Sequence, residues 1–541
     1  MSKNNRGGWM VRAAAVLAVF LAFDIFPGFA ARPSQDIPRP GGTLHVRTFS
    51  DTLKPNLDPA LGSWVFITEQ IFGGLVRLDN DLNPVPDLAE YWRLEDDGKT
   101  SVFYLRKGVK FHNGRELTSD DVKFSLERLL QPEVHSPFYE YFAAKVVGAL
   151  DYREGRAADV AGFKTPDKYV FEIRWRNPYV SALYLLGMSF CKILPKSLVQ
   201  GQEKDFFWKP VGTGPFRFES WLRSPRLDIV GVRLEKNNAY FGNKANLAFL
   251  EVSPYYTVDH FMNKEIEIVP FLSGRIARSG CQVIDGGLQN MTFLLMSCHI
   301  PPLDRPSIRQ ALASGIDKEK LADAVRRDES NRRATNNFVP AKWPGFFPRD
   351  DASSFNFDKA RQTLDEQGFF MEKKFPELIL YLPWPRDPEN LEFARELENQ
   401  LETLRITLTV KYYRTIAEVK SSTQPYLVKV DWAIDVPDPE NIIMPLFQSR
   451  SEINLRNLHY ANSRLDKLLD EAGVERSLNR RTELFRQMEQ ILESDLPAVP
   501  LYSSEPRIAL QPYVRGVRVP ALGFQYLDVR EIWLDQRGPR P

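Results

Sequence analysis

Residues 431–441, with the sequence D-W-A-I-D-V-P-D-P-E-N, place four carboxylates and one indole beside two prolines. Proline disrupts regular backbone hydrogen bonding and restricts the residue before it, so we expect a rigid turn here. The preceding residues 426–430 are apolar and β-branched, which predicts a short strand. A strand that ends in a tryptophan and an aspartate can present an aromatic face and a carboxylate at a cleft. A solvated acidic surface turn has the same composition and is the alternative interpretation.

The composition indicates a large protein with several apolar clusters. The chain has 541 residues, of which 43% are hydrophobic and 26% charged, and it contains 39 prolines. Its net charge is +1, from 71 basic and 70 acidic residues. A nucleic-acid-binding protein would concentrate Lys and Arg on one face. We therefore expect no nucleic-acid partner, whereas small or zwitterionic ligands fit this balance.

The N-terminus has the layout of a secretory signal peptide. Three basic residues precede the unbroken apolar run 13–23, and small residues follow near 28–30. The run is too short to span a bilayer. We expect residues 1–30 to be a signal peptide and the mature protein to be exported to the periplasm. An uncleaved N-terminal anchor, which would make the protein a membrane-tethered sensor, is the alternative.

The cysteines and histidines suggest little reactive chemistry. In an oxidising compartment the three cysteines allow one disulfide, for which we expect Cys281 and Cys298, while Cys191 lies in an apolar segment and is expected to be buried. No metal-ligand spacing occurs, and we expect no cofactor. His112 stands between a strand and a turn without a second ligand nearby, which favours a structural role.

Enzyme motifs are missing from the sequence. It contains no Gly-x-Ser-x-Gly elbow and no His-Glu-x-x-His pair. Residues 212–218 superficially resemble a phosphate loop but lack the Lys-Ser/Thr and the helix that such a loop requires. We expect a binding protein with no catalytic residue. A secreted hydrolase with an acidic pair is the less favoured alternative.

Two kinds of pattern follow one another along the chain. The first 285 residues are rich in hairpins, with strands predicted at 42–47 and 101–106 and a capping box at Thr118 that opens a helix. Residues 84–92 predict a turn followed by one or two helical turns. From about 290 to 500, strands alternate with helices, such as those predicted to begin at Pro388 and to cover 465–472 and 480–493.

This order predicts an α/β fold with two lobes, an enlarged first lobe, and a hinge of two crossing segments. The predicted boundaries are a signal peptide at 1–30, lobe I at 31–285 with an inserted subdomain at about 80–205, lobe II at 286–500, and a return to lobe I at 501–541. Ligand clefts prefer such domain interfaces.

Four segments in this order resemble one protein family. They are residues 88–122 (with L-A-E-Y-W and L-R-K-G-V-K-F-H-N-G), 212–216 (G-T-G-P-F), 308–317 (I-R-Q-A-L and I-D) and 499–502 (V-P-L-Y). Together they are similar to the bacterial extracellular solute-binding proteins of family 5, the oligopeptide-, dipeptide- and nickel-binding type. The resemblance implies a monomeric periplasmic receptor that captures an extended ligand and delivers it to the permease subunits of an ABC importer. A short peptide is the expected ligand, and a nickel chelate, an opine or an oligosaccharide is the alternative.

The resemblance also implies where the ligand binds. In peptide-binding members an aspartate that follows a tryptophan receives the α-ammonium group of the ligand, and the matching residue here is Asp435. The implied ligand-binding set is Asp435, Trp432 and Ala433, with Ser63, Trp64 and Val65 on the facing lobe. Asp431 stands where relatives usually have glycine, and it adds bulk and charge next to this pocket.

Overall fold

The computed structural model describes residues 38–48, 56–287, 290–325, 331–340, 343, 355–369, 373–384, 388–419, 423–433 and 436–535. The chain divides into an N-terminal unit, residues 1–38, and one compact unit, residues 39–541. The predicted signal peptide lies outside the described residues. Within the described residues, no helix combines the length and the apolar character needed to cross a membrane.

A seven-stranded sheet forms the first lobe, with the strand order β12-β19-β11-β1-β10-β9-β8. β1 lies in its interior and pairs in parallel with β10 and β11, while the other neighbours are antiparallel. In β1 the buried Leu44 and Val46 alternate with half-buried residues, as the sequence predicts. The strands are β1 (Thr43–Arg47), β8 (Phe216–Arg223), β9 (Ile229–Lys236), β10 (Phe249–Ser253), β11 (Ile268–Val269), β12 (Gln282–Asp285) and β19 (Arg507–Leu510).

A four-stranded antiparallel sheet with the order β4-β5-β7-β6 supports a second group of elements, which we call the hairpin region (residues 89–186). Its elements are β4 (Ala89–Glu95), β5 (Thr100–Leu105), β6 (Phe163–Asp167), β7 (Val170–Arg174), α2 (Ser119–Leu130), α3 (Glu140–Ala143), α4 (Ala149–Arg153) and α5 (Ala182–Leu186). The capping box is confirmed, because the Thr118 N–H donates to Asp121 Oδ2 at 2.9 Å. Val122 and Leu126 on this helix are fully buried.

The expected helical turns at 84–92 are wrong. This segment forms β3 (Pro84–Pro86), which pairs with β2 (Val76–Leu78), and then β4, which pairs with β5. Sheet partners that lie elsewhere in the sequence decide its conformation, and they outweigh its local helical pattern.

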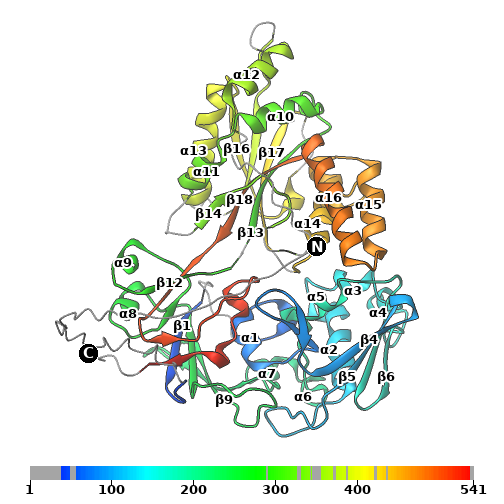
Figure 1. The fold of residues 1–541 in the computed structure, drawn as a ribbon, viewed down its shortest axis with the longest axis vertical. Coiled ribbons are helices and arrows are strands. Elements are labelled where there is room, and N and C mark those ends of the chain that lie inside the picture. The colour runs from blue at the N-terminus through cyan, green and yellow to red at the C-terminus, as the bar shows by residue number, and fades with distance from the viewer. Residues whose placement is uncertain are drawn as a thin grey trace, which may run out of the picture. The chain divides into compact units, whose positions relative to one another are not determined.

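A six-stranded sheet forms the second lobe, with the order β14-β18-β13-β17-β15-β16. Its strands are β13 (Asn290–Met296), β14 (Asn331–Ala334), β15 (Leu378–Pro383), β16 (Leu408–Tyr413), β17 (Tyr426–Ala433) and β18 (Ala498–Glu505). Figure 1 shows helices α10 to α13 beside this sheet, and their apolar residues share one buried cluster with it. They are α10 (Pro306–Ser314), α11 (Lys318–Ala324), α12 (Phe357–Glu366) and α13 (Pro388–Thr403). The predicted helix start at Pro388 is confirmed.

Three further helices follow the acidic segment: α14 (Glu440–Phe447), α15 (Ser463–Val474) and α16 (Leu478–Asp495). The helices predicted at 465–472 and 480–493 lie inside α15 and α16 and are confirmed. The remaining short elements are α1 (Val65–Ile71), α6 (Lys196–Val199), α7 (Glu203–Phe206), α8 (Val258–Met262), α9 (Gly274–Ala277), β20 (Val514–Arg515) and β21 (Trp533–Leu534).

The chain crosses between the two large sheets twice, from β12 to β13 and from β18 to β19. The crossings run side by side, because β12 pairs with β19 and β13 pairs with β18. Between them the Gly286 N–H donates to Pro506 O at 2.6 Å. A Cβ at Gly286 would lie 2.4 Å from this oxygen, so glycine allows the close approach. The predicted two-lobed α/β fold with two crossing segments is confirmed.

The expected disulfide between Cys281 and Cys298 is wrong, since both are free thiols. Cys281 precedes β12 of the first lobe, and its Sγ contacts Ile276 O at 3.3 Å. Cys298 follows β13 of the second lobe, and its Sγ contacts Met296 O at 3.3 Å. The two side chains pack against different hydrophobic clusters. Cys191 is buried as predicted, and burial raises the pKa of its thiol.

Candidate functional site

A cavity of about 420 Å³ lies next to Trp432, near the end of β17. The hairpin region contributes lining residues from 137–145 and Tyr179, and the second lobe contributes residues from 432–453. Most of its lining is aromatic or aliphatic: Pro137, Phe138, Tyr141, Tyr179, Trp432, Val436, Met444, Pro445 and Ile453. We call this space the Trp432 cavity. Its volume lies within the range of small-ligand pockets.

Trp432 is held in this position by the second-lobe sheet, where it pairs with Met291 of β13. Its indole Nε1 is buried and has no hydrogen-bond partner within the described parts of the chain. Asn441 also lines the cavity, and its Oδ1 is likewise buried without a partner there, while its Nδ2 donates to Tyr141 Oη at 2.8 Å. Buried indole N–H groups normally find an acceptor. Both polar atoms belong to residues that line the cavity, and both are closed off from solvent.

The other members of the predicted set are placed differently. Ala433 ends β17 opposite Asn290, and Asp435 lies outside the described residues. Ser63, Trp64 and Val65 stand at the start of α1 in the first lobe, and none of them is among the described residues that line the Trp432 cavity.

Trp64 has an unusual backbone conformation. Its φ of 59° lies in the left-handed region, which is rare for a bulky residue. Its side chain packs against the apolar cluster of the first-lobe sheet.

Two of the four acids in segment 431–441 are engaged with residues of the hairpin region. Asp438 is buried, accepts two hydrogen bonds from Arg481 at 2.7 and 2.9 Å, and also accepts one from Ser181 Oγ. Glu440 forms an ion pair with Lys145 at 2.7 Å and another with Arg481 at 3.1 Å. Since Ser181 and Lys145 belong to the hairpin region, these contacts join it to the second lobe.

The electrostatics of Asp438 exclude it as a free ligand carboxylate. Burial raises the pKa of Asp438, but the Arg481 guanidinium and the hydrogen bonds lower it, and the net pKa lies below its ordinary value. The group is therefore ionised and already paired. Asp431 is also engaged, because Thr292 Oγ1 donates to it at 2.7 Å and Lys429 Nζ lies 2.5 Å away. The fourth acid is Asp435.

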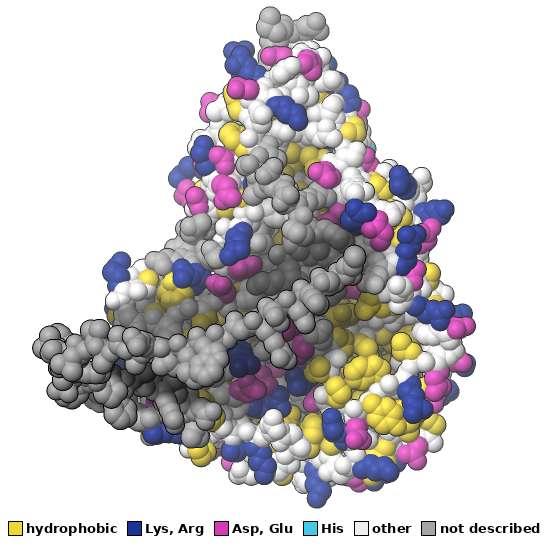
Figure 2. All heavy atoms as spheres, viewed as in Figure 1, with side chains coloured by type: hydrophobic (Ala, Val, Ile, Leu, Met, Phe, Trp, Pro, Cys, Tyr) yellow, Lys and Arg dark blue, Asp and Glu magenta, His cyan; other side chains and the backbone are white. Residues whose placement is uncertain are grey.

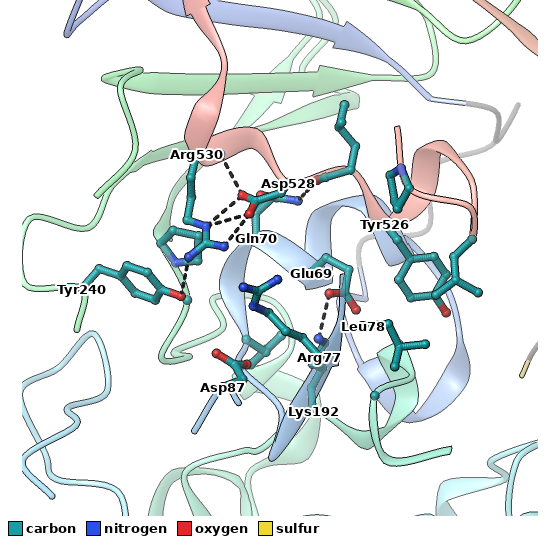
Figure 3. Close-up of a pocket in the computed structure, with 18 residues that line it drawn as sticks. Glu69, Gln70, Arg77, Leu78, Asp87, Lys192, Tyr240, Tyr526, Asp528 and Arg530 are labelled. Atoms are coloured by element: carbon teal, nitrogen blue, oxygen red, sulfur yellow. Dashed lines mark hydrogen bonds and ion pairs between the residues drawn. The ribbon is translucent and has the colours of Figure 1, made fainter. Parts of the chain in front are cut away.

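A second, smaller pocket of about 80 Å³ in the first lobe is lined by Glu69 and Gln70 of α1 (Figure 3). Two ion pairs lie in its lining: Lys192 Nζ is 2.7 Å from Glu69, and Arg530 Nε donates to Asp528 at 2.8 Å. Gln70 Nε2 donates to Leu527 O at 3.0 Å, which fastens the C-terminal segment to α1. The space is far smaller than a peptide needs. We interpret this pocket as a polar join within the first lobe.

The glycine-rich turn at 212–216 has a structural role as well. A Cβ at Gly212 would lie 2.0 Å from Ile71 O, and one at Gly214 would lie 2.3 Å from Gln70 O. His112 clamps the turn, since its Nδ1 accepts from the Gly212 N–H at 3.2 Å and its Nε2 lies 3.1 Å from Gly214 O. Burial lowers the pKa of His112 to about 4, so the ring is neutral at pH 7.

Sequence reasoning missed the hairpin-region wall of the cavity. Phe138, Tyr141 and Lys145 lie about 290 residues before Trp432 in the chain, and Tyr179 lies about 250 residues before it. The aromatic-rich run S-P-F-Y-E-Y-F at 136–142 is the signal that could have indicated it. In Figure 2 hydrophobic side chains gather over the part of the visible face that carries α2, α3 and α5 in Figure 1, while acidic and basic side chains are interspersed over the rest.

Two lobes joined by two crossings, with a lined cavity where the hairpin region meets the second lobe, define a solute-binding protein. Residues 83–454 match the family described as bacterial extracellular solute-binding proteins, family 5. The chain belongs to this family, and the resemblance noted in the sequence is confirmed.

The relatives share both sequence and fold with this chain. It is 26% identical over 473 residues to the dipeptide-binding protein of Escherichia coli, covering 82% of this chain and 85% of that protein. It is 26% identical over 490 residues to heme-binding protein A of Haemophilus influenzae, covering 84% and 86%. The unliganded open form of the periplasmic murein tripeptide-binding protein MppA superposes with a TM-score of 0.77 at 19% identity, covering 93% of this chain and 99% of that chain.

Proposed function

We propose that this protein is a periplasmic receptor that captures a short peptide between its lobes and delivers it to the permease subunits of an ABC importer. The observation that carries the proposal is the Trp432 cavity, whose mainly aromatic and aliphatic lining comes from both the hairpin region and the second lobe. A pocket of this kind can hold an apolar side chain, while backbone hydrogen bonds bind an extended peptide whatever its side chains are. The dipeptide-binding relative supports a peptide as the solute.

In this proposal Asp435 receives the α-ammonium group of the peptide. Trp432 and Ala433 form the wall next to it, and Ser63, Trp64 and Val65 belong to the facing lobe. The assignment of Asp435 rests on the family pattern and on the pairing of its neighbours. Asp431, Asp438 and Glu440 already have protein partners.

The remaining proposals concern processing and organisation. Residues 1–30 are removed as a signal peptide on export, and the mature protein acts as a monomer. Lobe I covers 31–285 with an inserted subdomain at about 80–205, lobe II covers 286–500, and residues 501–541 return to lobe I.

The test compares free-amine and N-acetylated peptides by isothermal titration calorimetry. Truncating one partner of a buried ion pair costs about 3–5 kcal/mol, so Asp435→Ala should weaken binding of a free-amine dipeptide more than a hundredfold. The same substitution should change the much weaker binding of the acetylated peptide little. Asp151→Ala is the control, since its half-exposed carboxylate pairs with Arg156 at the surface of the hairpin region.

Two outcomes would contradict the proposal. Equal losses for the free and the acetylated peptide would exclude the ammonium contact. A heme, nickel chelate or sugar that co-purifies with the wild-type protein in native mass spectrometry, together with no binding of any dipeptide, would replace the peptide by that solute.

A further inference from the structure

A second cavity adjoins the Trp432 cavity and has the same volume, about 420 Å³. We call it the outer compartment. Its lining combines residues 176–179 of the hairpin region with residues from α14 and α15 of the second lobe. Both cavities are lined by the same five residues: Ala144, Lys145, Tyr179, Glu440 and Met444. These shared residues are the boundary between the two spaces.

An ion pair lies in this boundary. Lys145 Nζ is 2.7 Å from Glu440 Oε1, and it lies 4.0 Å from the centre of the Tyr179 ring. The second carboxylate oxygen of Glu440 is held by Arg481 at 3.1 Å. The Lys145 side chain is 24% exposed and that of Glu440 is 14% exposed. Each charge is thus fixed by more than one contact.

The direction of the pKa shift of Lys145 agrees with a stable ion pair to Glu440. Burial lowers the pKa of Lys145, but Tyr179 and Glu440 raise it, and the net pKa lies above its ordinary value. The ammonium group is therefore charged at every physiological pH. A ligand group that moves past this point must separate two oppositely charged, largely buried groups.

The two spaces differ in chemistry. The Trp432 cavity is mainly aromatic and aliphatic, as described above. The outer compartment carries several polar groups: Arg176, Asn177, Gln448, Arg450 and Asp470. An apolar side chain that fits the Trp432 cavity gains no binding free energy by entering the polar outer compartment.

We propose that the Lys145–Glu440 ion pair closes the far end of the ligand cavity and so sets the largest side chain that the first residue of a bound peptide can carry. This inference rests on the proposed peptide-binding function. Lys145 and Glu440 act here as specificity-determining residues, because they limit the size of the ligand and leave its main chain to the contacts around Trp432.

The test uses a variant in which both charges are removed together, Lys145→Ala with Glu440→Ala. Arg481 keeps its bidentate partner Asp438 in this variant. The probes are Met-Leu and a dipeptide whose first residue is Nε-dansyl-lysine, followed by leucine. The wild type should bind the dansyl probe at least about tenfold more weakly than Met-Leu, because a filled pocket rejects added bulk. In the double variant this ratio should fall by at least about tenfold, whatever the change in the affinity for Met-Leu itself.

A matched control removes an exposed ion pair of the same region, Lys168→Ala with Glu116→Ala, whose charges lie 2.7 Å apart. It should leave the ratio of the two affinities unchanged. If the Lys145/Glu440 variant unfolds, Glu440→Gln is used instead. It removes the charge that holds Lys145 in place, so the ratio of the two affinities should shift towards the dansyl probe relative to the wild type.

The outcomes separate this inference from the proposed function. If a folded variant binds Met-Leu and retains the wild-type ratio, the ion pair does not limit the size of the first side chain, and the proposed peptide binding stands. If the wild-type protein binds neither probe, both the proposed peptide-binding function and the proposed size limit are contradicted.

Discussion

Replacing Asp438 by alanine should destabilise the protein far more than replacing any surface acid. The Asp438 carboxylate accepts hydrogen bonds from Arg481 at 2.7 and 2.9 Å and from the Glu440 N–H at 2.9 Å, and Ser181 Oγ also donates to it. The side chains of Asp438 and Arg481 are only 6% and 8% exposed. Without Asp438, the Arg481 guanidinium stays buried with Glu440 and Ala472 O as its remaining partners.

The expected magnitude follows from that burial. Breaking a buried pair by removing one partner costs about 3–5 kcal/mol, because the other charge is left without compensation. Urea unfolding at pH 7, followed by circular dichroism, measures the loss as a lower midpoint at constant slope. Asp470→Ala is the matched control: its partner is Arg450, both side chains are more than half exposed, and such a surface pair contributes less than about 1 kcal/mol.

The reasoning also predicts a partial rescue. Arg481→Met combined with Asp438→Ala removes both charges, so the double variant should be more stable than Asp438→Ala alone. If Asp438→Ala loses no more stability than Asp470→Ala, the buried bidentate pair does not stabilise the fold, and this prediction is refuted.

Two further predictions concern the turn at 212–216. The pKa of His112 is about 4 in the folded chain, against an ordinary value of 6.5, so between these pH values only the unfolded chain binds the proton. Stability should therefore fall by about 3 kcal/mol as the pH drops from 6.5 to 4, and His112→Asn should flatten this part of the profile in thermal unfolding. Gly214→Ala should lower the melting temperature because its Cβ would lie 2.3 Å from Gln70 O, whereas Gly473→Ala in α15 meets no atom within 4 Å and should stabilise by about 0.5–1 kcal/mol. A Gly214→Ala variant as stable as the wild type, or a pH profile that His112→Asn leaves unchanged, would contradict the proposed clamp.

The sequence predicted those elements whose causes are local. The Thr118 capping box, the helix start at Pro388 and the alternation in β1 each depend on neighbouring residues, and the structure contains all three. The two crossings were also predicted, because the order of hairpins and strand–helix units limits how the chain can return to its first sheet.

The wrong predictions share one physical cause: the conformation of these residues depends on partners far away in the sequence. Residues 84–92 become strands because β2 and β5 pair with them. Cys281 and Cys298 are only 17 positions apart in the sequence, but the chain crosses from one sheet to the other between them. The Lys145 side of the cavity could not be predicted for the same reason, because Lys145 contacts Glu440, which lies 295 residues further along the chain.

The four acids of segment 431–441 show how contacts assign roles that composition leaves equal. A carboxylate that already has a buried cationic partner gains little from a ligand's ammonium group, because it would have to give up one ion pair to form another. Asp438 and Glu440 are excluded by Arg481 and Lys145, and Asp431 by Lys429. These three pairs also keep the segment close to neutral. A cationic ligand group that enters beside Trp432 must therefore be met by a carboxylate outside these pairs, and the family pattern proposes Asp435 for that role.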